Sequence, residues 1–274
     1  MARPASTLPE DFPKPVFRPL DGHVEIAVAE AAEARMARPR RVTAILAAMC
    51  ARLGSAEGGA DSARRVSAAG REWLLQRAGL EFFRGTRWFE APCPGCGARF
   101  DLELDLTAVP QGRAGAGFPV IEVETSLGAR RFEAPNGHHE EAFAARRDGD
   151  ARRIFAGLCG LADEAAAEVA RFEAADLERI DAALEAVSPE IADGVNAACP
   201  DCGGPVRVRI DPLTFAFPRP EAVLREVHAI AMAYRWSERA ILDLPSRRRR
   251  AYVALIAGDA DSRAARPRGG MRLS

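Results

Sequence analysis

The sequence predicts an α+β fold, in which a split four-cysteine ribbon and a small antiparallel sheet carry a helical insert and flanking helical lobes. Three observations lead to this prediction. The stretch CPGCGARFDLELDL at 93–106 is nearly repeated as CPDCGGPVRVRIDP at 199–212, which begins 106 positions later (199 − 93 = 106). Each copy continues with alternating apolar and polar residues, which is typical of a half-buried strand. The segments before, between and after the copies have apolar residues at helical spacing instead.

The elements of the first half follow from these patterns in chain order. Prolines recur through residues 1–22, which disfavours a helix and predicts an extended, Pro-rich arm that is loose or lies on another surface. Apolar residues at spacings of three and four predict an N-terminal helical region over 23–85, with one helix continuing to Leu53. Residues 86–135 contain the first cysteine pair, the strand after it and two further strands joined by a turn at 126–128.

The second half is predicted in the same way. Residues 136–188 are rich in alanine, and their apolar stripe predicts an insert that is helical over 140–187. Residues 189–218 contain the second cysteine pair and its strand, and 219–258 should form a C-terminal block of three helices. Residues 259–274 have too few apolar side chains to fold, so we expect a disordered tail.

Composition is that of an ordinary globular protein, and it argues against some functions. The 274 residues are 48% hydrophobic and 28% charged, which is enough for one large core or two smaller ones. The net charge of −1 provides no field that would attract nucleic acid or an anionic membrane. The start lacks the apolar run of a signal peptide, and apolar windows are far shorter than the roughly 20 residues of a membrane helix. We therefore expect a cytoplasmic protein without membrane contact.

Four of the six cysteines form two CPxCG motifs, which makes them the candidate metal ligands. The proline presets a tight turn, and the glycine can adopt the positive φ that lets backbone amides point toward the sulfurs. A closed tetrahedral zinc site needs four thiolates, and each motif supplies two. We therefore predict one structural Zn²⁺ bound by Cys93, Cys96, Cys199 and Cys202.

The strands after the two motifs match in register. Phe100 and Val206 each lie four positions after the second cysteine of their motif, and apolar residues alternate from both. The polar residues between them differ in charge, with Asp101, Glu103 and Asp105 in the first copy and Arg207 and Arg209 in the second. Because adjacent strands would pair these charges favourably, we expect one sheet with both apolar faces in the same core. The region from 107 to 188 would then be an insertion.

The other cysteines and the histidines have simpler interpretations. A redox function for the CxxC motifs would need a helix N-terminus that lowers a thiol pKa, whereas strands follow both motifs. Cys50 and Cys159 lie in apolar contexts and should be small core residues. We expect His138 and His139 to begin a solvated helix, and His228 to pack or form a hydrogen bond within an apolar helix.

A run of arginines, Arg247 to Arg250, begins a helix in the C-terminal block. Cations at this end oppose the helix macrodipole at a cost of a few tenths to about 1 kcal/mol each, so something should compensate. Pairing with acids such as Glu238 and Asp243, or simple solvation, is one interpretation. Contact with an acidic partner surface or with nucleic acid phosphate is the other.

Several stretches resemble a known family, above all the block YRWSERAILDLPSRRRRAY, together with RPRRVTAILAAMCARLG, REWLLQRAG and WFEAPCPGCGARFDLEL. They are similar to the baseplate hub assembly chaperones of contractile-tailed phages and contractile injection systems, over roughly residues 25–258. The resemblance implies a non-enzymatic protein of the bacterial host cytosol that helps to assemble the baseplate hub or becomes part of it. Its partners would be hub or other tail proteins, with no small-molecule substrate.

The same block supplies the predicted partner-binding residues, because Trp, Tyr and Arg most often anchor protein interfaces. These residues are Tyr234, Trp236, Arg247, Arg248, Arg249, Arg250 and Tyr252. Trp236 could equally staple two helices together. The alternative function is a zinc-ribbon protein that binds nucleic acid. That function would need basic and aromatic residues on the exposed ribbon face, and the acidic residues after the first motif argue against it.

Overall fold

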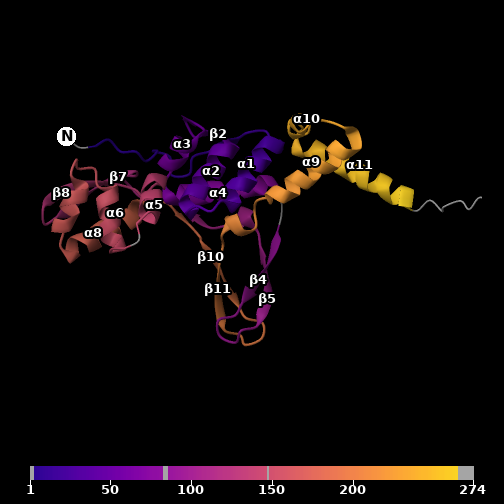
Figure 1. The fold of residues 1–274 in the computed structure, drawn as a ribbon. Helices are drawn as coiled ribbons and strands as arrows, with labels where there is room; N and C mark the ends of the chain where they lie inside the picture. Colours follow the sequence, from indigo (N-terminus) through magenta and orange to yellow (C-terminus); the bar gives the residue numbers. More distant parts are fainter. Residues whose placement is uncertain (1–2, 83–85, 147, 265–274) are drawn as a thin grey trace, which may run out of the picture. The chain divides into compact units, whose positions relative to one another are not determined.

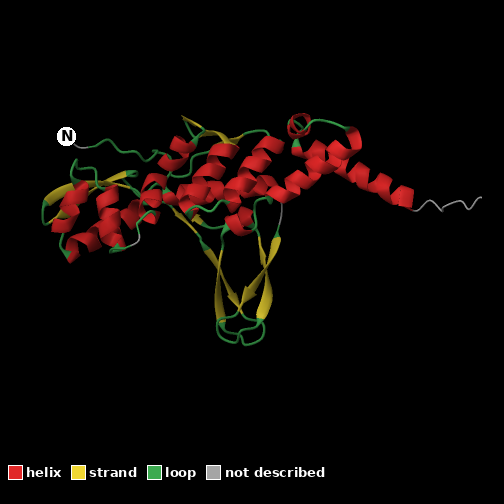
Figure 2. Cartoon of the chain, in the orientation of Figure 1, coloured by secondary structure: helices red, strands yellow, loops and turns green. Residues whose placement is uncertain are grey.

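The structure, a computed structural model, describes residues 3–82, 86–146 and 148–264 (Figure 1). It confirms the predicted α+β class, with helices and small antiparallel sheets along the chain (Figure 2). The chain divides into two compact units, the first made of residues 1–17 and 34–217 and the second of residues 18–33 and 218–274. Among the described residues, no helix combines the length and apolar character needed to cross a membrane.

The N-terminal part of the first unit combines a small sheet with helices. Its elements are β1 (Pro15–Phe17), α2 (Arg38–Met49), β2 (Cys50–Leu53), β3 (Ala56–Glu57), α3 (Ala60–Arg65), α4 (Ala68–Phe82) and α5 (Gly137–Ala144). The strands are antiparallel in the order β1-β2-β3. The arm is extended as predicted, and it lies on this unit, because Thr7 and Leu8 are buried and the Leu8 amide donates to the Arg65 carbonyl at 2.8 Å.

The single helix predicted to reach Leu53 is wrong. Helix α1 (Gly22–Glu33) ends first, and α2 then begins at Arg38 with Pro39 in its first turn. Proline fits there because the first helical N–H groups have no partner within the helix, whereas a proline farther inside would remove a hydrogen bond. At Cys50 the backbone becomes extended, with φ −92° and ψ 123°, and begins β2.

The inserted region forms a lobe of strands and helices. Its elements are β7 (Val120–Thr125), β8 (Gly128–Glu133), α6 (Ala151–Cys159), α7 (Ala165–Glu168), the 3-10 helix η2 (Val169–Arg171) and α8 (Ala174–Val187). Strands β7 and β8 form the hairpin predicted around 126–128. The core of the lobe contains Phe132, Cys159 and Ile180.

The continuous helix predicted over 140–187 is also wrong, because it is interrupted. Gly149 adopts a positive φ of 126°, which ordinary residues rarely adopt. The next residue, Asp150, caps α6 by accepting a hydrogen bond from the Arg152 amide at 3.1 Å. The apolar periodicity over 140–187 therefore belongs to several short helices of one lobe and not to one continuous helix.

Two hairpins interrupt this helical arrangement. The first hairpin is β4 (Arg87–Pro92) with β5 (Arg99–Leu104), and the second hairpin is β10 (Gly194–Ala198) with β11 (Pro205–Arg209). Short 3-10 helices follow them, η1 (Leu106–Ala108) and η3 (Pro212–Thr214). Strands β6 (Gln111–Gly112) and β9 (Glu190–Ile191) pair with each other. This pairing joins the two ends of the insert, so hairpins that are far apart in the sequence begin from neighbouring points.

The second unit is helical and consists of α1, α9 (Pro220–Tyr234), α10 (Glu238–Leu242) and α11 (Ser246–Ala264). Its core includes Ile230 and Ile241, with Ile26 of α1 packed against them. Helix α1, which we predicted in the region 23–85, therefore groups with the C-terminal helices. Helix α11 also continues past residue 258, where we predicted a disordered tail, and residues 265–274 lie outside the described part of the chain.

Candidate metal centre

The four predicted ligands meet at the turns of the two hairpins. Cys93 directly follows β4 and Cys199 directly follows β10, while Cys96 and Cys202 lie farther into the same turns. All four Sγ atoms lie within 4.8 Å of one another, and the two turns lie together in Figure 1. Cys93 and Cys199 are buried, whereas Cys96 and Cys202 are exposed. The structure thus forms one four-cysteine cluster that can hold a metal ion.

The two turns have the same backbone geometry, as the repeated motif predicts. The Gly97 amide donates to the Cys93 carbonyl at 2.9 Å, and the Gly203 amide donates to the Cys199 carbonyl at 2.9 Å. Gly97 and Gly203 adopt positive φ values of 77° and 70°. The Cys93 amide closes its turn by donating to the Ala98 carbonyl at 2.8 Å, and the second turn closes in the same way at 2.9 Å.

The separations between the sulfurs fit a tetrahedral metal site. Cys93 Sγ lies 3.7 Å from Cys202 Sγ, and Cys96 Sγ lies 3.7 Å from Cys199 Sγ. Four sulfurs bound to one ion at about 2.3 Å in a regular tetrahedron would be about 3.8 Å apart. A disulfide would bring two sulfurs to about 2.05 Å, so these cysteines are free thiols. Both observed contacts join one turn to the other, and an ion here would link the hairpins.

The acidities within the cluster also favour a bound cation. Backbone amides of Cys96 and Gly95 lower the pKa of the Cys93 thiol to about 7. At Cys96 the Ala98 amide also favours ionisation, but hydrogen bonds with the neighbouring thiols, above all that of Cys202, outweigh it and raise its pKa to about 12. Ionisation is therefore favoured at Cys93 and opposed at Cys96. A metal ion would remove this opposition by supplying positive charge at the centre.

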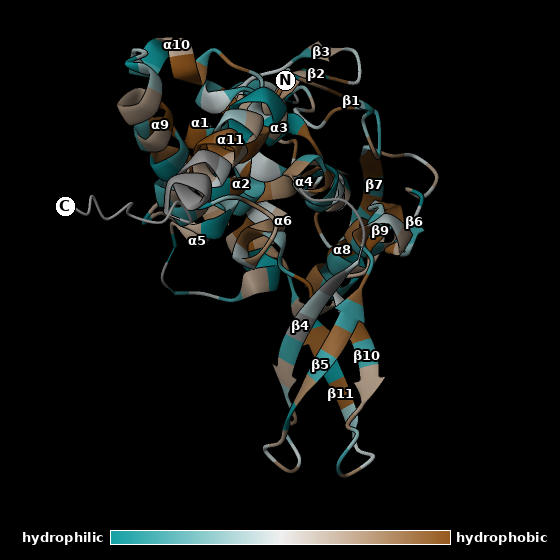
Figure 3. Cartoon of the chain, turned by 90° about the vertical axis from the view of Figure 1, so that its right-hand side faces the viewer, coloured by the Kyte–Doolittle hydropathy of each residue, from teal (hydrophilic) through white to brown (hydrophobic). Residues whose placement is uncertain are grey.

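Apolar side chains from both hairpins pack behind the sulfurs. Val206 is buried with Cys93 and Cys199, and Phe100 and Val208 pack against them. This arrangement confirms the predicted common core of the two copies. The alternation that produces it is visible along β5 and β11, where hydrophobic and hydrophilic residues follow one another (Figure 3).

The prediction that these strands form one sheet is wrong, because β4-β5 and β10-β11 are separate two-stranded sheets. The acidic residues of β5 therefore do not pair with the arginines of β11. Asp101 lies opposite Glu90 within its own hairpin, and Arg207 instead pairs with Asp193 at 2.5 Å. The hairpins meet through their apolar faces and their sulfurs, which leaves the charged faces on the outside.

Both hairpins are fixed at their base by a matching aspartate. The carboxylate of Asp105 accepts from the Thr107 amide at 2.8 Å and caps η1, and Asp211 accepts from the Leu213 amide at 3.2 Å and caps η3. Both 3-10 helices contact α4. Sequence reasoning missed this role, although the two aspartates occupy the same position of the repeat (211 − 105 = 106).

The second hairpin has an additional ionic anchor, which the described residues do not provide for the first. Arg38 Nη2 contacts Asp211 Oδ1 at 3.0 Å and Glu72 Oε2 at 2.8 Å. All three side chains are about two-thirds buried or more. The Glu72 carboxylate raises the pKa of Arg38 well above its usual value, and Asp211 adds to this effect. Arg38 thus ties α2 and α4 to the base of the second hairpin.

The predicted partner-binding residues lie in the second unit, where the aromatic ones form a cluster. The ring centroids of Tyr234 and Trp236 are 5.4 Å apart, and those of Trp236 and Tyr252 are 5.1 Å apart. Tyr234 and Trp236 are each 38% exposed. Trp236 therefore staples the ends of α9 and α11 together and also presents part of its ring to solvent.

The arginine run divides into two pairs with different surroundings. Arg249 is fully buried and forms ion pairs with two carboxylates, the buried one of Glu25 and that of Glu226. Arg250 donates a hydrogen bond to Glu25 at 2.6 Å. The interpretation that acids compensate the arginine charges is therefore correct for Arg249 and Arg250, but the acids are Glu25 and Glu226 and not Glu238 or Asp243. Arg247 and Arg248 are exposed, and Arg248 lies over the Tyr252 ring at 5.9 Å from its centroid. Arg250 is also exposed but is held by Glu25, so among the described arginines of the run Arg247 and Arg248 are the exposed ones that no buried carboxylate holds.

Cys50 and Cys159 are buried, as predicted, but the histidine predictions are wrong in two places. His228 is exposed on α9. His139 is buried, with Nε2 at 3.4 Å from Glu133 Oε1 and Nδ1 at 3.7 Å from Cys159 Sγ. Although burial opposes ionisation of Glu133, hydrogen bonds from His139 and from the N-terminal arm lower its pKa to about 2. This group holds the arm in place, which local sequence could not reveal.

Comparisons with known proteins add no family assignment. No family model matches the chain, and no curated protein or solved structure is significantly similar to it. The case for the metal centre therefore rests on its ligand types, distances and backbone geometry.

Proposed function

We propose that this protein is a non-enzymatic assembly chaperone or structural component of the baseplate hub of a contractile tail. It acts in the bacterial cytoplasm, binds hub or other tail proteins and contains a structural zinc. The proposal joins the resemblance of the C-terminal block to hub assembly chaperones with one observation. The part of the chain that carries the resemblance also exposes an aromatic cluster with arginines beside it.

The exposed apolar residues support protein binding by the second unit. Met232 and Leu255 are 59% and 60% exposed, and Leu224 is 49% exposed, in addition to the aromatic cluster. Tyr252 and Leu255 lie three positions apart on α11, so Leu255 extends the surface next to the aromatic rings. Apolar groups of this size are costly to hydrate, and burial against another protein would remove that cost.

Zinc suits the four-cysteine centre because all four tetrahedral positions are filled by thiolates. Such a closed site leaves no position for a substrate or a reactive water. Its contribution is to stability, because it links two hairpins that do not share a sheet. Elemental analysis of protein purified without chelator should give one zinc per chain. Iron in its place, or no metal, would contradict this part of the proposal.

Docking is tested by co-expressing the chain with candidate hub proteins and capturing it by affinity tag. Arg247→Glu with Arg248→Glu should weaken capture of a hub protein without lowering the melting temperature, because both side chains are exposed. Arg250 is unsuitable for this purpose, since it contacts the buried Glu25. Arg207→Glu on the ribbon serves as the matched control and should leave capture unchanged.

Two outcomes would reject the proposal. If the variant with Arg247→Glu and Arg248→Glu captures the hub protein as well as the parent does, the docking surface does not include these arginines. Purification with nucleic acid and without any tail protein would favour the alternative, a zinc-ribbon protein that binds nucleic acid.

A further inference from the structure

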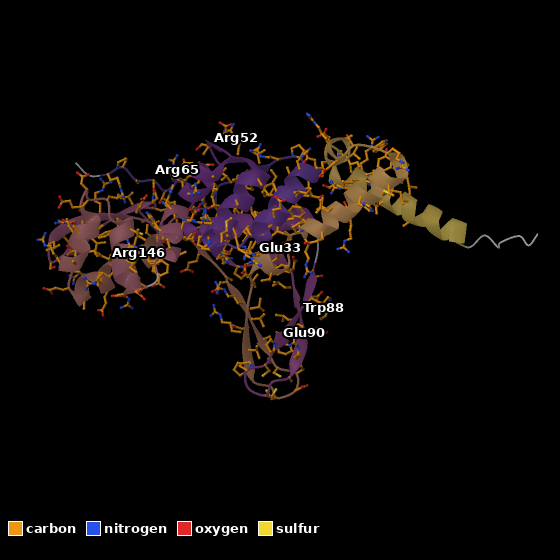
Figure 4. The ribbon with its side chains drawn as sticks, viewed as in Figure 1. Glu33, Arg52, Arg65, Trp88, Glu90 and Arg146 are labelled. Atoms are coloured by element: carbon orange, nitrogen blue, oxygen red, sulfur yellow. The ribbon has the colours of Figure 1, made fainter. Side chains whose placement is uncertain are left out.

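The outer face of the first hairpin places an exposed tryptophan among carboxylates. Trp88 is 64% exposed, more than any other large hydrophobic residue in the described part of the chain. Glu90 shares its face of β4, and the strand register places Glu103 opposite Trp88 and Asp101 opposite Glu90. Figure 4 shows Trp88 and Glu90 on the side of β4 that points away from the second hairpin.

The second hairpin shows that this face is not required for the metal site. At the equivalent positions, 106 residues later, Gly194 replaces Trp88, Arg207 replaces Asp101 and Arg209 replaces Glu103. The second hairpin nevertheless forms the same turn and supplies the same two ligands. Trp88, Asp101 and Glu103 are therefore not needed to form the turn or to supply the cysteine ligands, which is what the two hairpins have in common.

This outer face also carries unfavourable interactions in the isolated chain. Glu90 and Asp101 are like charges directly opposite each other on paired strands, an arrangement that destabilises a sheet. Arg99 pairs with Glu90, but within the described residues no cation pairs with Asp101 or Glu103. No described cation lies over the Trp88 ring either, whereas Trp73 and Tyr252 each have an arginine over theirs.

We propose that this acidic tryptophan face, defined by Trp88, Glu90, Asp101 and Glu103, binds an arginine-bearing segment of a partner protein. A guanidinium can lie flat on an indole ring and donate paired hydrogen bonds to a carboxylate at the same time. Its positive charge also relieves the repulsion between Glu90 and Asp101. The negative charge of the face selects against nucleic acid and anionic lipid. This surface is separate from the one assigned to the hub partner, and the inference does not depend on that function.

The test uses an acetylated octa-arginine peptide and the full-length, metal-loaded protein. The chain has three tryptophans, so its three indole N–H signals can be followed by NMR, with that of Trp88 assigned through Trp88→Phe. We expect the Trp88 signal to move on titration. Asp101→Asn with Glu103→Gln should raise the Kd by about fivefold or more, since each exposed charge contributes modestly. Metal content should not change.

Matched controls make the result specific. Glu178→Gln with Glu185→Gln removes two exposed carboxylates from α8 and should change the Kd by less than about twofold. A Trp88 signal that does not move at low ionic strength, or an equal loss from the α8 variant, would overturn the proposal. So would octa-lysine binding as tightly as octa-arginine. The protein could also self-associate, and this could be lost in two double variants, Asp101→Asn with Glu103→Gln and Arg207→Gln with Arg209→Gln. That result would show that the acidic tryptophan face binds a second copy of the chain and not an arginine-bearing partner.

Discussion

The two ribbon hairpins share a turn that carries two cysteines, and they differ on the faces that point away from it. Both turns have the same backbone hydrogen bonds and a glycine at positive φ. After each hairpin, an aspartate caps the following 3-10 helix. Their outer faces carry opposite charges, and only one of them has an exposed tryptophan. The shared features are those that a metal ion bound by both turns and the base of each hairpin would require. The differing residues are free to serve other purposes.

The hairpins also differ in how they are anchored. Arg38 binds the aspartate at the base of the second hairpin, whereas Asp105 at the base of the first has a local hydrogen bond to Thr107. The local bond to the Thr107 hydroxyl and amide lowers the pKa of Asp105. The metal would therefore connect a hairpin with an ionic anchor to one without, and the second hairpin should be the more stable of the two when the metal is removed.

The largest expected effect comes from breaking the metal cluster. Cys199→Ser removes one of four thiolates, and metal binding contributes about 10 kcal/mol or more to the folding of such sites. We expect loss of the metal and a severe drop in melting temperature, and the same change on adding a strong chelator to the parent. Metal content and thermal unfolding measured on the same sample provide the check.

A matched control for this change lies in the same turn. Asp201→Gly gives the second turn the sequence of the first, CPGCG, without touching a ligand. This variant should retain one metal ion per chain and unfold near the parental temperature. A Cys199→Ser protein that is as stable as the parent would show that the cluster has no structural role.

Removing the ionic anchor should separate the behaviour of the two hairpins. Arg38→Met leaves two partly buried carboxylates, Glu72 and Asp211, without their cation, and should cost about 1–3 kcal/mol. Amide exchange should become faster in β11 than in β5. Arg99→Met, which removes an exposed pair with Glu90, should cost less than about 1 kcal/mol. Equal acceleration in both hairpins would mean that Arg38 acts on the unit as a whole.

The two turn glycines should respond alike, which tests the equivalence of the copies. A Cβ at Gly97 or at Gly203 would meet no atom within 4 Å, so alanine adds only the backbone cost of positive φ. That cost is about 1–2 kcal/mol per residue. Gly97→Ala and Gly203→Ala should therefore lower the free energy of unfolding by similar amounts in a urea titration. A much larger loss at one position would reveal a constraint that the other turn lacks.

The sequence was sufficient to identify the four-cysteine cluster because its determinants are local. The proline, glycine and cysteine positions of each motif define a turn, and the repeat identifies the second pair of ligands. The relation between the hairpins was not local. Opposite charges on β5 and β11 are compatible with one shared sheet, and equally with two sheets whose charged faces point outward. The hairpins contact each other through their sulfurs, which requires no hydrogen bonds between their strands.

The grouping of α1 with the C-terminal helices could not be predicted for a similar reason. It depends on the pairing of Glu25 with Arg249, two buried charges that are more than two hundred positions apart. Each has the sequence context of an ordinary surface residue on a helix. The burial of His139 likewise depends on Glu133 and on the N-terminal arm that covers it.

The smallest expected effect comes from making the outer faces alike. Asp101→Arg with Glu103→Arg gives the first hairpin the charges of the second and replaces the repulsion between Glu90 and residue 101 with attraction. Cross-strand charge pairs contribute about 0.2–1 kcal/mol, so the free energy of unfolding should rise by an amount in this range. The metal content should stay the same, because neither side chain contacts the cluster. If the variant loses its metal or becomes less stable, the carboxylates have a structural role in this hairpin after all. If it becomes more stable while losing the affinity for octa-arginine, the acidic face is retained at the expense of stability, as expected for a binding surface.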